Sequence, residues 1–172
     1  MFFGDREFFA IEAELQEIHE KWTYGHLRIW VGGQPFGDVE DTSDLASSAR
    51  WGRTLLAASA RRRRPDLDAT TASDVYELLY GRYVTRVNTP ENKPMAGTWD
   101  RDPYLLDGVG ESSLRDKCAV LVVGRGDGRD RVVVMSFRDA RVVEVVVDAG
   151  VFDGAVSSYC AWVESLRETP SG

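Results

Sequence analysis

The sequence predicts a single α+β domain over residues 1–172, in which an antiparallel sheet is built from an N-terminal and a C-terminal β-meander and about three helices pack on one face. Three observations predict this class: apolar and polar residues alternate near the N-terminus, valine-rich runs lie in the last third, and a helical spacing of apolar residues follows them. The expected order is a meander over about 8–38, helices over about 43–84, a loop over 86–103, a second meander over about 118–148 and a final helix over about 152–168.

The first meander begins with two strands of alternating character. In residues 9–16 and 26–31, apolar and polar side chains take turns, which is the period of a half-buried strand. Residues 18–22 are long enough to join these strands without a tight turn. The glycine pair at 32–33 suits the positive φ angles of a primed hairpin turn, after which residues 34–36 can return as a short third strand.

Two helices are expected between the meanders. Thr42 or Ser43 can cap the first helix, with Asp44 in its first turn. This helix ends in the four arginines of residues 61–64, where cations oppose the negative end of the helix dipole. The second helix is expected over residues 73–84, because tyrosines and leucines recur there at the spacing of one helical stripe.

The last third of the chain has the clearest pattern. Three β-branched runs at 118–123, 131–137 and 142–147 are separated by short polar segments, which predicts an antiparallel meander. Apolar residues then recur at helical spacing over residues 152–166. The preceding segment 86–103 contains three prolines and is expected to be a long loop, which in a compact domain is either functional or mobile.

Negative charge is concentrated near the N-terminus. Residues 1–49 hold ten acidic and three basic residues, a net charge of −7 that equals that of the whole chain. An acidic surface repels nucleic acids and membrane headgroups and attracts basic partners, although the same charge also serves solubility. The arginines at 61–64 do not form one stripe, which favours a capping and solubilising role over polyanion binding. We therefore expect neither nucleic acid nor a membrane as partner.

The residue pattern gives little support for an enzyme or a metal site. His19 and His26 lack nearby cysteines and the spacing of zinc ligands. The glycines of residues 124–128 follow one strand and precede another, so no helix N-terminus is offered to a phosphate. Cys118 and Cys160 are expected to be structural thiols, because two isolated cysteines are no disulfide framework. We expect no catalytic residue and no cofactor.

The chain also lacks the pattern of a membrane or secreted protein. No stretch approaches the roughly 20 apolar residues of a membrane-spanning helix. The first five residues are followed at once by charged residues, without the basic segment and long apolar segment of a secretory signal. We therefore expect a cytoplasmic protein.

Several motifs are similar to those of a known family. They are Phe3-Gly4-Asp5, residues 9–12, Trp22-Thr23-Tyr24-Gly25, Trp30, Gly33, Gly37-Asp38 and, before the valine-rich meander, residues 107–113. In these motifs the chain resembles the bacterial polymorphic-toxin immunity proteins of the forty-second class. The resemblance implies a non-enzymatic protein in the producer's cytoplasm that binds and neutralises a cognate secreted toxin domain. It carries over no catalytic residues.

Candidate toxin-binding residues follow from the expected sheet. If helices cover one face, the other face and its edge carry Glu12, Glu14, Arg28, Trp30, Glu40, Asp41 and Asp44. Trp30 is the best anchor, because a partly exposed tryptophan beside charged groups is typical of a binding hot spot, unless the loop over 86–103 covers it. An acidic inhibitor suits a basic toxin such as a nuclease, although the arginines at 61–64 depart from that picture.

Two other functions stay open at this point. The chain could be a non-catalytic regulatory or scaffold module of a bacterial system that binds another protein. It could also be an enzyme whose site is built from dispersed carboxylates, which would require a deep cavity lined by acids with perturbed pKa values.

Overall fold

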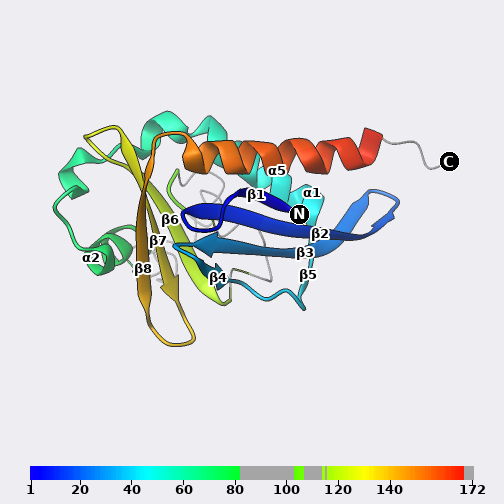
Figure 1. The fold of residues 1–172 in the computed structure, drawn as a ribbon, viewed down its shortest axis with the longest axis horizontal. Coiled ribbons are helices and arrows are strands. Elements are labelled where there is room, and N and C mark those ends of the chain that lie inside the picture. The colour runs from blue at the N-terminus through cyan, green and yellow to red at the C-terminus, as the bar shows by residue number, and fades with distance from the viewer. Residues whose placement is uncertain (82–102, 107–113, 115, 169–172) are drawn as a thin grey trace, which may run out of the picture.

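The computed structural model describes residues 1–81, 103–106, 114 and 116–168, which form two antiparallel sheets and three α-helices (Figure 1). The first sheet contains β1 (Phe2–Asp5), β2 (Phe9–His19), β3 (Trp22–Val31), β4 (Gln34–Phe36) and β5 (Thr42–Asp44). The second contains β6 (Cys118–Gly124), β7 (Arg129–Ser136) and β8 (Val142–Asp148). The helices are α1 (Leu45–Ala57), α2 (Ala72–Tyr76) and α5 (Val151–Glu168). The predicted α+β class is confirmed.

The two meanders form separate sheets, so the expectation of one sheet built from both is wrong. The first sheet has the order β1-β2-β3-β4 with β5 paired to β3, and the second has the order β6-β7-β8. The second sheet is separate because it lies between two cores, and the side chains of β6 are buried on both of its faces. Val120 and Val122 belong to the main core, while Leu121 and Val123 belong to a second core. A sheet buried on both faces forms a middle layer.

The helices are divided between the two sheets, so the expectation that about three helices pack on one face is also wrong. Helices α1 and α5 contact each other and the strands of the first sheet, as Figure 1 shows. Helix α2 instead contacts β7 and β8, where Val75 is fully buried in the second core. The second sheet needs this cover because both of its faces are apolar.

The turns of the first sheet differ in part from the prediction. His19 pairs with Trp22, so only Glu20 and Lys21 join β2 to β3, and the expected longer connection is wrong. Glu20 adopts a φ of 52°, which lets the strands pair up to the turn.

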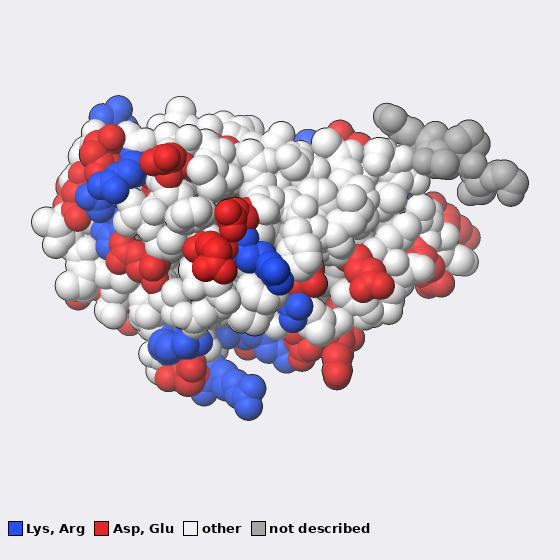
Figure 2. All heavy atoms as spheres, in the orientation of Figure 1, with Lys and Arg blue, Asp and Glu red and all other residues white. Residues whose placement is uncertain are grey.

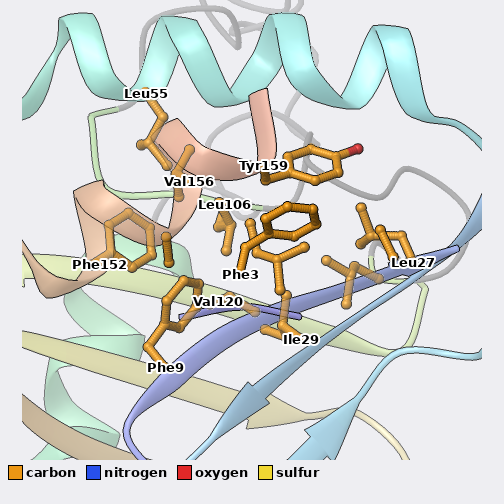
Figure 3. Packing of buried hydrophobic residues seen from close by; sticks show 14 of the residues in the cluster. Phe3, Phe9, Leu27, Ile29, Leu55, Leu106, Val120, Phe152, Val156 and Tyr159 are labelled. Atoms are coloured by element: carbon orange, nitrogen blue, oxygen red, sulfur yellow. The ribbon is translucent and has the colours of Figure 1, made fainter. Parts of the chain in front are cut away.

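The glycine pair of the next turn behaves as predicted. Gly32 and Gly33 have φ angles of 57° and 75° and join β3 to β4, because Val31 pairs with Gln34. Strand β1 was not predicted. It adds a fourth strand beside β2, with Phe3 turned into the core (Figure 3).

Helix α1 begins and ends at other residues than expected. Asp44 caps it, not Thr42 or Ser43, because the Asp44 carboxylate accepts hydrogen bonds from the backbone N–H groups of Ala46 and Ser47 at 3.2 and 3.3 Å. Thr42 and Ser43 belong to β5 instead. The helix ends at Ala57, before the arginines.

The arginine run at 61–64 lies against the second sheet and α5. Arg62 is only 3% exposed, donates to the carboxylate of Asp153, and its guanidinium carbon lies 5.3 Å from the ring centroid of Phe152. The backbone N–H of Arg64 donates to the Gly124 carbonyl at 2.7 Å. The expected capping and solubilising role is therefore wrong for Arg62, because its side chain is buried against Asp153 and Phe152 of α5.

Later elements follow the prediction closely. The three strands of the second sheet and helix α5 lie where the β-branched runs and the helical spacing place them. Helix α2 continues as a π-helical turn over Glu77–Gly81, and residues 82–84 of the expected helix lie outside the described residues.

The main core lies between the first sheet, α1 and α5 and extends to one face of the second sheet (Figure 3). The rings of Phe9 and Phe152 lie 4.6 Å apart between β2 and α5, and the Tyr159 hydroxyl donates to the Leu45 carbonyl at 3.2 Å. Cys118 and Cys160 are free and buried, as predicted. Burial raises the pKa of the Cys118 thiol to about 12 and that of Cys160 to about 11, so both stay protonated near neutral pH.

Candidate functional site

The side of the first sheet turned away from α1 and α5 is called here the outer face. Alternation along β2 and β3 buries Ile11, Leu27 and Ile29 on the inner side, so their strand neighbours point outward. The outer face carries Phe2, Glu12, Glu14, Tyr24, His26, Arg28, Trp30 and Pro35. Four of the residues expected at the toxin interface, Glu12, Glu14, Arg28 and Trp30, thus share one face.

Trp30 lies at the centre of a group of five residues, Phe2, Arg6, Glu12, Arg28 and Trp30, which we call the Trp30 cluster. The indole Nε1 donates to Glu12 Oε2 at 2.8 Å, and the Arg28 guanidinium donates to the same oxygen. The guanidinium carbons of Arg6 and Arg28 each lie 5.0 Å from the Trp30 ring centroid. These contacts hold the half-buried indole in one orientation.

Two members of the cluster were missed by the sequence analysis. Phe2 is 47% exposed and its ring meets that of Trp30 edge-on at 6.3 Å between centroids. Arg6, in the turn between β1 and β2, reaches over both rings. The apolar residues at the N-terminus could have predicted β1 and thereby the position of Phe2 beside β2. No local pattern indicates the contact made by Arg6.

Glu14 lies farther along the same face, away from Trp30. It is exposed and lies opposite His26 in the β2–β3 register. Beside it, Gln16 Nε2 lies 2.6 Å from His26 Nε2, and the Thr42 hydroxyl donates to Gln16 Oε1 at 3.2 Å. This polar chain connects the outer face to β5.

The three acids expected at the sheet edge do not form one cluster. Asp44 turns its carboxylate to the start of α1 and also accepts from the backbone N–H of Thr23 at 3.3 Å. Asp41 lies 3.8 Å from the Nζ of Lys117. Glu40 is exposed. Most of the loop that was the alternative cover for Trp30 (residues 86–102) and the motif at 107–113 lie outside the described residues, so that alternative is not tested.

The Glu12 carboxylate has a lowered pKa. Burial would raise this pKa, but hydrogen bonds from Arg28 and Trp30 outweigh the burial and favour the charged form. Because the pKa is lower in the folded state, Glu12 contributes stability above its ordinary pKa of 4.5, and this stability is lost as the pH falls through the lowered value.

We therefore expect Glu12→Gln to lower the free energy of unfolding at pH 7 and to matter progressively less below the ordinary pKa of Glu12. Urea unfolding of both proteins across this pH range measures the difference. Glu14→Gln is the matched control, because Glu14 is exposed on the same strand. A difference between wild type and Glu12→Gln that stays constant with pH would contradict the assignment.

The fold and the outer face define a small α+β protein that presents a preorganised aromatic and charged cluster on one sheet face, a composition typical of protein-binding surfaces. A family model described as immunity protein 42 matches residues 1–162, so the chain belongs to this family. It is an immunity protein, which neutralises a toxin, and the resemblance seen in its motifs is confirmed. The regulatory or scaffold alternative is not supported.

The comparison with solved structures agrees with this assignment at the level of the fold. The chain is similar to the crystal structure of CdiI from Burkholderia dolosa AUO158, with a TM-score of 0.71 and 20% sequence identity, over 94% of this chain and 99% of that chain. No curated protein matches the chain. In the part of the chain that the structure describes, no helix has the length and apolar composition needed to cross a bilayer.

Proposed function

We propose that the protein neutralises its cognate toxin domain by binding it through the outer face, in the cytoplasm of the producing cell and without catalysis. The observation that carries this proposal is the Trp30 cluster. Its indole is half-buried and already oriented by Glu12, Arg6 and Arg28, so little side-chain entropy is lost when a partner packs on it. Tryptophan and arginine at the centre of a patch are the residues that most often dominate binding energy.

Acidic residues elsewhere on the outer face and at its edge favour a basic toxin, such as a nuclease. Glu14 and Glu40 are exposed, and Asp41 is half-buried at the sheet edge. Figure 2 shows acidic side chains gathered at the tip of the β2–β3 hairpin and near the start of β5. Asp44 completes this edge as the cap that joins β5 to α1. Such a surface would speed association with a basic domain and make it sensitive to salt.

We expect Trp30→Ala to weaken toxin binding by more than about 1 kcal/mol, roughly fivefold in Kd, and to leave the fold intact. Calorimetric titration with the cognate toxin domain, which we expect to be encoded beside this gene, measures the change. Phe137→Ala is the control, because Phe137 is an aromatic residue 39% exposed after β7, on the other sheet. Unchanged binding by the Trp30 variant would remove Trp30 from the interface.

Co-expression tests neutralisation in the cell. The wild-type chain is expected to restore growth of cells that produce the adjacent toxin domain and to co-purify with it. A chain that forms no complex with that domain, or that protects without binding it, would overturn the proposed mechanism.

A further inference from the structure

A cavity of about 320 Å³ lies between the tip of the β2–β3 hairpin, α1 from Ala46 to Arg53 and the last turns of α5. It is separate from the Trp30 cluster and none of the proposed interface residues except Asp44 lines it. Its charged lining consists of Lys21, Arg50, Arg53, Arg167, Asp44 and Glu164. Cations therefore exceed carboxylates in this cavity, although the whole chain has a net charge of −7.

The two carboxylates of the cavity already have partners. Glu164 accepts from Arg53, and Asp44 caps α1. Among the side chains that the structure describes, which leave out Glu168, no carboxylate lies within ion-pair distance of Lys21, Arg50 or Arg167. Arg50 donates to the Ser47 hydroxyl at 2.6 Å, Arg167 donates to the Lys21 carbonyl, and the Lys21 Nζ lies 5.2 Å from the Trp22 ring centroid.

A pair of stacked aromatic rings on β3 leads from the lining of the cavity to the outer face. Trp22 lines the cavity and is 38% exposed. Its ring stacks on that of Tyr24 with 6.4 Å between centroids, and Tyr24 lies on the same strand and face as Trp30. A toxin that covers the outer face along the length of β3, from Trp30 to Tyr24, would therefore also contact Trp22 at the cavity.

We propose that this cavity binds a carboxylate side chain of the toxin and thereby sets the orientation of the toxin on the outer face. A carboxylate is the group that best satisfies adjacent guanidinium and ammonium donors, since charge-assisted hydrogen bonds are stronger than neutral ones. The inference rests on the proposed function. The exposed acids of the outer face attract a basic surface and the cavity accepts an acidic side chain, so the combined pattern discriminates against toxins with only one of these features.

The test is charge reversal at Arg50, which is exposed on α1 and lies outside the Trp30 cluster. Arg50→Glu is expected to weaken binding of the adjacent toxin domain at least tenfold in calorimetric titration at low salt, and Lys21→Gln to weaken it in the same direction. Arg138→Glu is the matched control, because Arg138 is an exposed arginine after β7 and far from the cavity. It makes the same change in net charge and is expected to alter Kd less than twofold.

Glutarate, a small dicarboxylate, serves as a second probe. An excess of glutarate is expected to weaken toxin binding by the wild type and to leave binding by Arg50→Glu unchanged. If Arg50→Glu binds the toxin as well as Arg138→Glu does, the inference is overturned. The proposed function is then judged separately, by whether Trp30→Ala weakens toxin binding. Glutarate binding to the wild type without any effect on the toxin would assign the cavity to a free anion and also overturn the inference. If the wild type binds no toxin, the proposed function itself fails.

Discussion

Replacing Phe152 by alanine is expected to lower the free energy of unfolding by about 3 to 5 kcal/mol. Phe152 is fully buried in the first turn of α5, and its ring lies 4.6 Å from that of Phe9 on β2 (Figure 3). The same ring supports the guanidinium of Arg62. The substitution therefore opens a cavity between α5 and the first sheet and also removes one contact of a buried charge.

Urea unfolding followed by circular dichroism measures this loss. Val151→Ala is the control, because the preceding residue is 37% exposed and its substitution is expected to change stability by less than about 0.5 kcal/mol. A domain of this size typically has 5 to 15 kcal/mol of stability, so the Phe152 variant should also protect cells less well at elevated temperature. A loss below about 1 kcal/mol would show that the core closes around the smaller side chain.

Replacing Arg131 by methionine is expected to lower the free energy of unfolding by about 3 kcal/mol. Arg131 is 3% exposed on β7, and each part of its guanidinium has a partner. Its Nε donates to Glu144 Oε1 at 2.6 Å, its Nη1 to the Leu67 carbonyl at 2.7 Å and its Nη2 to the Thr70 carbonyl at 3.0 Å. Methionine keeps much of the apolar volume but leaves a carboxylate and two carbonyls without their donors.

The Arg131 prediction is tested by a double-mutant cycle in urea unfolding. Arg131→Met is expected to cost less in a Glu144→Gln background, because the carboxylate that the first change leaves unpaired is then absent. Arg129→Met is the control, since the Arg129 side chain is 51% exposed and solvent screens its ion pair with Asp127, so its loss should change stability little. Equal costs for Arg131→Met in both backgrounds would show that the ion pair with Glu144 is not responsible.

Elements with a strong local period could be predicted from the sequence. The β-branched runs of β6, β7 and β8 and the apolar spacing of α5 led to nearly the right bounds. The prediction failed where the local pattern was weak or where a distant residue decided the outcome. Asp44 took the cap of α1 because β5 ends there against β3, and β1 is too short to show a clear period.

The candidate site was predicted in part. Alternation along two paired strands was enough to place Glu12, Glu14, Arg28 and Trp30 on one face. It could not indicate that Glu12 holds both Arg28 and Trp30, that Arg6 reaches over the indole, or that the carboxylate of Asp44 turns to α1. Such contacts depend on side-chain direction and on the turns that bring strands together. Whether these residues bind the toxin stays a prediction.

The sequence by itself determined the α+β class, most strands and helices and the family, because these depend on the period of apolar residues and on short motifs. Only the tertiary structure decided that the meanders form two sheets and that Arg62, 91 residues from Asp153 in the chain, is buried beside it. It also brought Lys21, Arg50 and Arg167 around one cavity. The physical reason is the distance in sequence over which each feature is decided. A local period indicates which face of an element is apolar, whereas packing between distant segments decides what that face contacts.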